Sequence, residues 1–191
     1  MATGSGEKAR TSRFGDQDAV SVSIAGPERP FFFDKLVVFD AADAAVNFAS
    51  TPILALPRSD LIIVGGYLHL DALKNGAASA QIIDAFVLSY SLGTVATADN
   101  DLVDANEADL KPAATLAAAT AGVSPHSKGV LDGARVLASG GATNYIDNNA
   151  GSLAVFLNMT LPDASIGVGV NRTLRVKGSL RLVTIGLGKN A

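Results

Sequence analysis

Residues 173–182 read TLRVKGSLRL, a run in which apolar and polar side chains alternate. The apolar series comprises Leu174, Val176, Leu180 and Leu182, and the polar series comprises Arg175, Lys177, Ser179 and Arg181. Successive side chains of a β-strand point to opposite faces of the sheet, so the alternation predicts a strand with one buried and one basic face. Gly178 falls in the apolar series, where a missing side chain predicts a bulge or a crossing neighbour.

Similar short runs recur along the chain, separated by Gly, Pro and Asn turns. They are residues 20–24, 31–39, 61–73 with a Gly65-Gly66 bulge, 82–92, 134–138 and 153–161. We expect residues 31–33 and 36–39 to belong to a buried sheet and residues 82–92 to form a central strand. Only short helical turns are expected, near 40–50 and 106–110. About eight short strands without crossover helices predict an all-β, antiparallel β-sandwich of jelly-roll type.

Two further segments complete the expected organisation. Residues 1–17 show neither helical nor strand periodicity and predict an extended N-terminal arm before one domain at 18–191. A floppy terminus explains the same pattern equally well. Residues 94–133 show no clear strand, and we interpret them as one long loop insertion. Loops of this kind commonly carry binding function.

Composition limits the possible functions. The 191 residues have a net charge of −3, which argues against a dedicated nucleic-acid-binding protein. Only 17% of the residues are charged, which indicates that part of the surface is covered by permanent assembly. The chain has no cysteine, so disulfides and thiolate chemistry are absent. Without an apolar run long enough to span a membrane, we expect folding in the cytoplasm.

No residue pattern makes a convincing catalytic, cofactor or metal site. His69 shares a predicted strand face with Tyr67 and Asp71, but a catalytic triad would need a glycine-flanked nucleophile that is missing here. His126 has no partner at metal-ligand spacing. The acidic run at 99–109 offers oxygen ligands suited to Ca²⁺ but lacks the spacing of an EF-hand, so a solvated loop is the favoured interpretation and calcium stays an alternative. We expect a protein that is not an enzyme.

Basic residues provide the most suggestive surface feature. One interpretation of the basic face is a solvated surface that protects an edge strand, and the other is docking against an acidic protein surface. We expect the arm to add reach to such docking. The predicted partner interface comprises Lys8, Arg10, Arg13 and Phe14 from the arm, with Arg172, Arg175, Lys177 and Arg181 from the last strand.

Three segments resemble small structural proteins of tailed bacteriophages, of the capsid decoration or cement type. The first ends in Ser-x-Gly-Thr-x-x-Thr-Ala (91–98), and the second is a Glu-Ala-Asp-x-x-Pro loop (107–112). The third combines a Leu-Asn strand at 157–158 with a final Thr-Leu-x-Val-x-Gly-x-Leu strand (173–180). The three segments are residues 82–100, 106–115 and 153–188, about a third of the chain, and their motifs are strand patterns without chemistry.

The resemblance implies a β-sandwich on the outside of an icosahedral shell, present as trimers and stabilising capsid subunits. The implied partner is the major capsid protein or another virion protein, and the implied location is the capsid surface of the virion. The long polar start is a departure that could act as a clamp on a neighbouring subunit. Two other classes remain open: a carbohydrate- or receptor-binding jelly roll, disfavoured by scattered tyrosines and no tryptophan, and a cupin-type enzyme, disfavoured by two distant histidines.

Overall fold

The structure is a computed structural model that describes residues 23–24, 30–39, 47–98, 102, 106–116, 126–131, 135–136, 142–143, 145–148, 150–167 and 169–186. The described residues contain β-strands and two short 3-10 helices, and no α-helix. Nor do they contain a helix long and apolar enough to cross a membrane. The predicted all-β class is therefore confirmed.

The large sheet is centred on β12, which pairs along one side with β4 and along the other with β2 and β1. Both β7 and β10 pair with the far side of β4, and all of these pairings are antiparallel. The sheet contains β1 (Ser23–Ile24), β2 (Phe31–Val38), β4 (Asp60–Lys74), β7 (His126–Leu131), β10 (Tyr145–Asp147) and β12 (Thr173–Gly186). Among the described residues, β2 pairs with β12 alone and so forms an edge of this sheet.

The small sheet has the order β3, β11, β5 and β6 and is also antiparallel. Its strands are β3 (Phe48–Ala55), β11 (Ala154–Thr160), β5 (Leu88–Gly93) and β6 (Lys111–Leu116). The remaining elements are the pair β8 (Arg135–Val136) and β9 (Ala142–Thr143) and the 3-10 helices η1 (Gly76–Ser79) and η2 (Asp163–Ser165).

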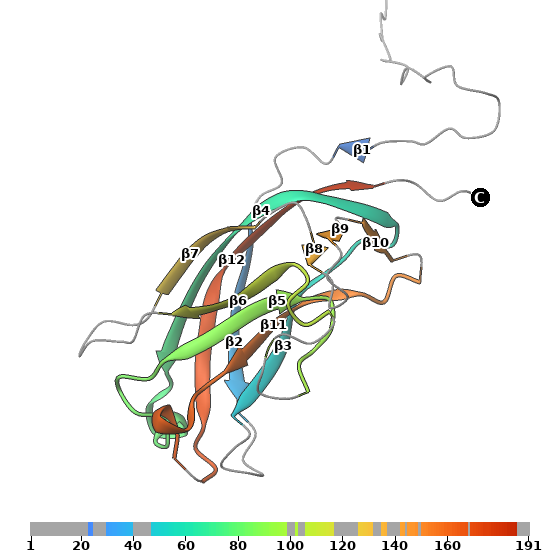
Figure 1. Ribbon diagram of the computed structural model, residues 1–191. Helices are drawn as coiled ribbons and strands as arrows, with labels where there is room; N and C mark the ends of the chain where they lie inside the picture. Colours follow the sequence, from blue (N-terminus) through green and yellow to red (C-terminus); the bar gives the residue numbers. More distant parts are fainter. Residues whose placement is uncertain are drawn as a thin grey trace, which may run out of the picture.

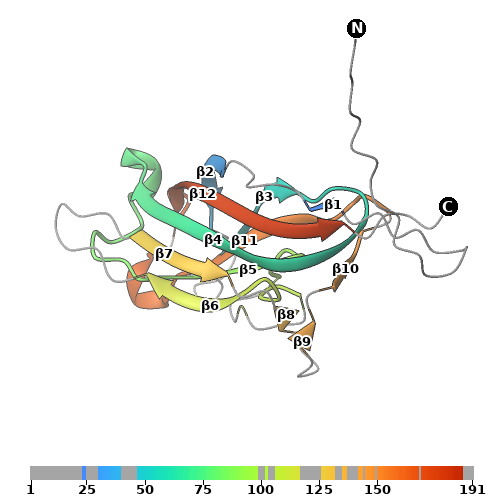
Figure 2. The same cartoon turned by 90° about the horizontal axis from the view of Figure 1, so that it is seen from above.

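The two sheets face each other as the layers of a sandwich (Figures 1 and 2). Their inner faces supply one apolar core, which includes Leu68 and Leu70 from β4 and Leu157 and Met159 from β11. Burial of such side chains is the main stabilising term of a domain of this kind. The predicted antiparallel β-sandwich of jelly-roll type is confirmed.

Strand β12 follows its predicted alternation. The buried series is Leu174, Val176, Leu180 and Leu182. Gly178 continues this series, and a Cβ atom there would overlap the carbonyl oxygen of His69 on β4 and approach the ring of Phe33 on β2 to 2.9 Å. The glycine therefore marks a close approach by neighbouring groups, one of the two explanations predicted for it.

The glycine pair at residues 65–66 also behaves as predicted. Val183 of β12 is paired with Gly65, whereas the next residue, Thr184, is paired with Ile63. One extra residue of β4 thus stands in the ladder as a β-bulge, and Gly65 has a φ of 155° that a side chain would disfavour. The bulge interrupts the pairing of the two longest strands of the sandwich.

Several expected boundaries are wrong. The segment 94–133 contains β6 in the small sheet and β7 in the large sheet, so it is not a loop insertion without strands. The expected strand 82–92 begins only at Leu88, while Ile82 forms an isolated bridge to Ile166. Residues 106–110 form turns and bends instead of a helical turn. The helical turn expected near 40–50 falls mostly outside the described residues, and its end, 48–50, belongs to β3.

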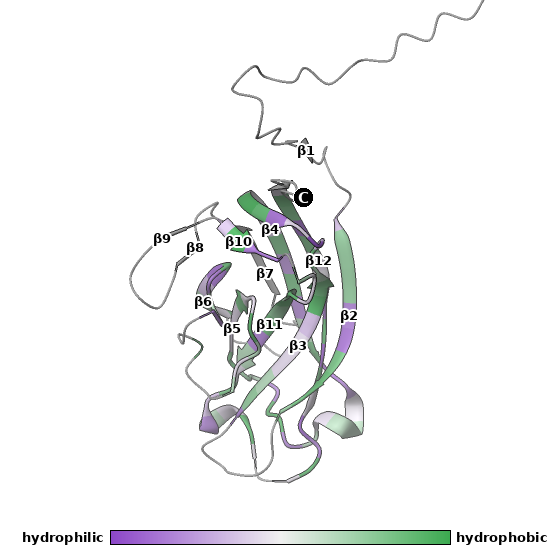
Figure 3. Cartoon of the chain, turned by 90° about the vertical axis from the view of Figure 1, so that its right-hand side faces the viewer, coloured by the Kyte–Doolittle hydropathy of each residue, from purple (hydrophilic) through white to green (hydrophobic). Residues whose placement is uncertain are grey.

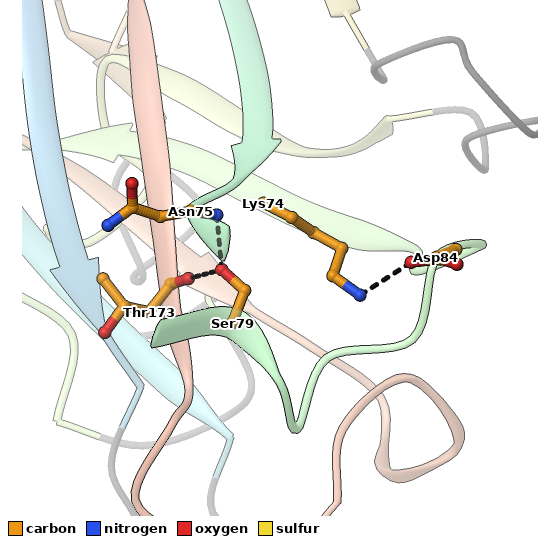
Figure 4. Close-up of polar contacts among 5 residues, drawn as sticks. All are labelled: Lys74, Asn75, Ser79, Asp84 and Thr173. Atoms are coloured by element: carbon orange, nitrogen blue, oxygen red, sulfur yellow. Dashed lines mark hydrogen bonds and ion pairs between the residues drawn. The ribbon is translucent and has the colours of Figure 1, made fainter. Parts of the chain in front are cut away.

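The connection after β4 is fixed by hydrogen bonds of Ser79. The Ser79 hydroxyl accepts a hydrogen bond of 2.6 Å from the backbone N–H of Asn75 and donates one to the carbonyl of Thr173, where β12 begins (Figure 4). Nearby, Lys74 and Asp84 form an ion pair of 2.7 Å. This turn therefore joins the end of β4 to the start of its partner strand.

Candidate functional site

The outer face of β2, β12 and β4 carries the predicted basic residues, and we call it the open face. In the register of the three strands, Asp34, Lys177 and Asp71 form one row across the sheet. Leu36, Arg175 and Leu73 form the adjacent row. Side chains that are directly opposite each other in an antiparallel sheet lie on one face and interact. The open face therefore alternates acidic, basic and apolar groups.

Acidic neighbours offset much of the basic charge of this face. The guanidinium of Arg175 donates two hydrogen bonds to the carboxylate of Asp34, of 2.7 and 2.5 Å. The hydrogen bond and the charge of Arg175 hold the pKa of Asp34 below its ordinary value of 3.8. Lys177 stands between two aspartates in the register, and Arg181 is exposed opposite Tyr67. The predicted basic face is thus mixed in charge, which removes part of the argument for an acidic partner.

Arg172 does not belong to this face, contrary to the prediction. Its side chain is only 1% exposed and donates a hydrogen bond to Oδ1 of Asn47, whose amide nitrogen donates one of 2.7 Å to Asp163. The carbonyl of Arg172 accepts a further bond of 3.0 Å from the N–H of Phe39. Arg172 therefore ties together the chain segments around the start of β12. The sequence did not distinguish it from its neighbours because all are basic residues in or beside the last strand.

The edge strand β2 carries an apolar strip on the open face. Phe32, Leu36 and Val38 are 74%, 60% and 63% exposed, and we call them the β2 stripe. Phe33 and Val37 alternate with them and are buried in the core. The expected burial of the run is therefore wrong for the stripe and for Phe31, which is 43% exposed. Asp34 and Lys35, which interrupt the apolar run, were the sequence signal that this strand lies at an edge.

Other predicted interface residues lie outside the described residues. These are Lys8, Arg10, Arg13 and Phe14, together with the whole expected arm at 1–17. Of the eight predicted residues, the structure brings three onto the open face: Arg175, Lys177 and Arg181.

Part of the outer face of the small sheet is covered by the chain itself. Ser50, Asn158 and Ser91 lie opposite one another on β3, β11 and β5, and we call them the polar row. Residues 94–98 and 106–110, here called the covering segment, fold over this row. Asn158 donates hydrogen bonds to the carbonyls of Val95 and Glu107, of 2.9 and 2.8 Å. The polar row thus holds backbone groups that would otherwise be buried without partners.

Further hydrogen bonds complete this attachment. The amide oxygen of Asn158 accepts bonds from the hydroxyl of Ser50 (2.6 Å) and the N–H of Thr97 (3.0 Å). Ser91 donates a bond of 2.8 Å to the carbonyl of Glu107. A Cβ atom at Gly93 would overlap the carbonyl oxygen of Asn106, so only glycine allows the covering segment to approach this closely.

The two buried acids of the covering segment bind backbone amides. Asp109 accepts hydrogen bonds from the N–H and the hydroxyl of Thr94, of 2.9 and 2.8 Å. Glu107 accepts one of 3.1 Å from the N–H of Ala98. The part of the acidic run that the structure describes is therefore used in loop architecture, and no cluster of metal-ligating side chains occurs among the described residues.

Two motifs of the phage-protein resemblance and Asn158 of its third segment meet in this attachment, whereas the final-strand motif at 173–180 belongs to β12 of the large sheet. The Ser-x-Gly-Thr-x-x-Thr-Ala motif supplies Ser91, Gly93, Thr94 and Thr97, the Glu-Ala-Asp motif supplies Glu107 and Asp109, and the Leu-Asn strand supplies Asn158. Segments that are far apart in the sequence thus form one buried polar network. The motifs specify how a loop seals one face of the sandwich, which explains why they carry no chemistry.

Histidine and tyrosine residues bear on the alternative functions. His69 lies 3.5 Å from Asp71, measured from Nε2 to Oδ1, and Asp71 is the register partner of His126. The sequence suggested that the two histidines are distant, but their strands are neighbours in the large sheet.

The tyrosines bear on the carbohydrate-binding alternative. Tyr90 is buried, and the ammonium group of Lys111 lies over its ring, 5.4 Å from the ring centroid. Tyr145 and Tyr67 are both exposed, but Tyr145 pairs with β4 five residues before Tyr67, roughly 16 Å along the strand.

Comparisons with known proteins add little to this description. No protein-family model matches the chain, and no curated protein matches it. Among solved structures, one titled Desmodium yellow mottle tymovirus is similar at 8% identity over 100% of both chains, with a TM-score of 0.33. A TM-score of this size does not establish a shared fold, so the functional argument rests on the residues of this chain.

Proposed function

We propose that this chain is a non-enzymatic structural protein of a virion, a decoration or cement protein that binds the outside of a phage shell and stabilises it. The observation that carries the proposal is a difference in solvent exposure between the outer faces of the two sheets. One is sealed by a built polar network, whereas the other presents the β2 stripe to solvent. Exposed apolar strips on a well-packed domain are typical of protein interaction sites.

The resemblance to phage decoration proteins gives the proposal its biological setting. Residues of its first two motifs join Asn158 of the third segment in one network, as expected if the segments are parts of a single architecture. The partner would be the major capsid protein or another virion protein, with a trimer as the expected assembly. The arm at 1–17 would act as a clamp whose extended length of about 50 Å could reach an adjacent subunit.

The carbohydrate-binding alternative receives no specific support from the site. Sugar sites in proteins usually stack aromatic rings on the ligand. The ring of Tyr90 is buried and cannot contact a sugar. Tyr67 and Tyr145 are too far apart along the direction of β4 to stack on the same sugar ring.

A co-sedimentation experiment tests the proposed function. The purified chain would be mixed with shells assembled from the major capsid protein that the same genome encodes. We expect the chain to pellet with the shells and to raise their melting temperature, whereas a β-sandwich of similar size and charge should stay in the supernatant. A chain that remains in the supernatant at every concentration would contradict the proposal. Retention on a glycan array in the same experiment series would favour the carbohydrate-binding alternative.

A further inference from the structure

We propose that the β2 stripe is the surface through which copies of this chain associate, with the stripes of neighbouring copies packed around a symmetry axis. This inference deepens the proposed function by naming the contact that forms the assembly. Four of the nine large hydrophobic residues exposed in the described part of the chain lie on β2, including all three of the stripe. Figure 3 shows β2 at the margin of the molecule, green on both sides of a purple centre.

The arrangement of β2 favours packing of side chains over addition of a further strand. Lys35 alternates with the stripe and lies on the inner side of the sheet, yet it is exposed at the edge. A charged residue that points inward on an edge strand opposes pairing with another strand, because that pairing would bury the charge. An extended peptide that adds to this edge is thus disfavoured, and the stripe itself is the part left to contact a partner.

Charge complementarity favours a second copy as that partner. Asp34 is bound by Arg175, and Lys177 stands between Asp34 and Asp71, so the open face has no dominant sign that would select a strongly acidic or basic protein. The same face of a second copy does not repel it. Its apolar stripe offers matching side chains, and its own acids and bases can exchange partners across the contact. Closed symmetry places identical patches together in this way.

The rest of the sandwich leaves little competing surface. The described part of the small sheet is sealed over the polar row by the covering segment. Val170 is the most exposed of the large hydrophobic residues, at 83%, but it lies in the loop before β12 and outside β2. Val170 therefore provides a matched control for the stripe.

Sedimentation of the full chain over the micromolar range tests the inference. We expect wild type to have the mass of two or more copies, and the double variant Phe32→Ser, Leu36→Lys to have the mass of one. Circular dichroism and thermal melting should remain close to wild type because both side chains are exposed. The control Val170→Ser should assemble like wild type.

Three outcomes would overturn the inference: a wild type that is monomeric throughout, a double variant that still assembles, and a control that dissociates as far as the double variant. The shell co-sedimentation experiment separates this inference from the proposed function. A monomer that still pellets with shells would reject the stripe as a self-association surface and leave the decoration function standing. An oligomer that stays in the supernatant when shells are present would reject the proposed function and leave the stripe standing as the self-association surface.

Discussion

The outer faces of the two sheets use polar residues in opposite ways. On the small sheet, Asn158 stands at the centre of the polar row and is completely buried beneath the covering segment. On the large sheet, Lys177 stands at the centre of a row formed with Asp34 and Asp71 and remains accessible to solvent. Both rows cross three strands. The first holds the chain in place, whereas the second leaves a surface on which another protein can pack.

The comparison teaches that residues with a recognisable pattern need not be the residues that bind. Loss of a buried hydrogen bond costs the desolvation free energy of the group left without a partner. Loss of an exposed ion pair costs little because water solvates both charges. Two of the recognisable motifs, together with Asn158 of the third segment, lie on the sealed face, where substitutions are expensive. Binding is assigned to the β2 stripe, which has no motif at all.

The largest effect should come from the buried side of β12. Leu180→Asp would place an unpaired carboxylate in the core, and we expect it to lower the free energy of unfolding by more than about 5 kcal/mol and to yield unfolded protein. Arg181→Asp changes the next residue, on the exposed side, and should fold normally. Circular dichroism of the two variants provides the measurement. A soluble, folded Leu180→Asp protein would refute the assignment of the two sides.

The next largest effect is expected from substitution of Asn158, at the centre of the polar row, compared with Lys177, at the centre of the row on the open face. Asn158→Ala would leave the carbonyl of Val95 and the N–H of Thr97 without their side-chain partner and would leave the carbonyl of Glu107 with its bond from Ser91 alone. We expect a loss of about 3–5 kcal/mol in denaturant unfolding. Lys177→Ala, its counterpart on the open face, should change stability by less than about 0.5 kcal/mol. Equal losses in the two variants would show that the rows do not differ as described.

A smaller effect is expected where the covering segment approaches β5. Gly93→Ala would push a methyl group against the backbone at Asn106 and Glu107, with an expected loss of about 2–3 kcal/mol. The N–H groups of Thr94 and Val95, which bind the carbonyl of Asn106 at 2.9 and 3.2 Å, should exchange with solvent faster. Amide exchange that matches wild type would mean that the segment does not rest on Gly93.

The smallest effect belongs to the exposed pair of Asp34 and Arg175. The pKa of Asp34 is lower in the folded state than its ordinary value of 3.8. The ionised carboxylate therefore stabilises the fold when the pH is above 3.8. This contribution is lost as the pH falls through the lower pKa of the folded state. Asp34→Asn should therefore melt about 1 °C or less below wild type at neutral pH. The difference should disappear in strong acid. A larger difference in acid than at neutral pH would reverse the sign of this argument.

Sequence reasoning succeeded where one physical rule acted alone. The alternation in β12 predicted its buried side and the close approach at Gly178 because strand periodicity is local. The number of short strands without crossover helices predicted the antiparallel sandwich. It failed where tertiary contacts decide. Arg172 was predicted at the surface, yet its burial depends on Asn47, a residue far away in the sequence. Strands β6 and β7 were missed because their apolar periodicity is weak, and pairing with β5 and β4 defines them.

The candidate site was predictable only in part. Arg175, Lys177 and Arg181 were placed correctly on one exposed face, but their acidic neighbours come from β2 and β4 and could not be read from the last strand. The β2 stripe was hidden for a similar reason. Asp34 and Lys35 indicate an edge strand, but only the pairing partners show which side chains of residues 31–38 stay exposed.

The position of β12 has a consequence for the order in which the molecule can form. This strand follows all the others in sequence, yet it lies between β2 and β4, which are synthesised much earlier. Pairings between segments so distant in the chain form slowly, because the intervening loop must close first. During synthesis the apolar residues of β2 therefore stay uncovered until β12 is available, and the large sheet is complete only after residues 173–186 have left the ribosome. Chaperone binding would be most useful during that interval.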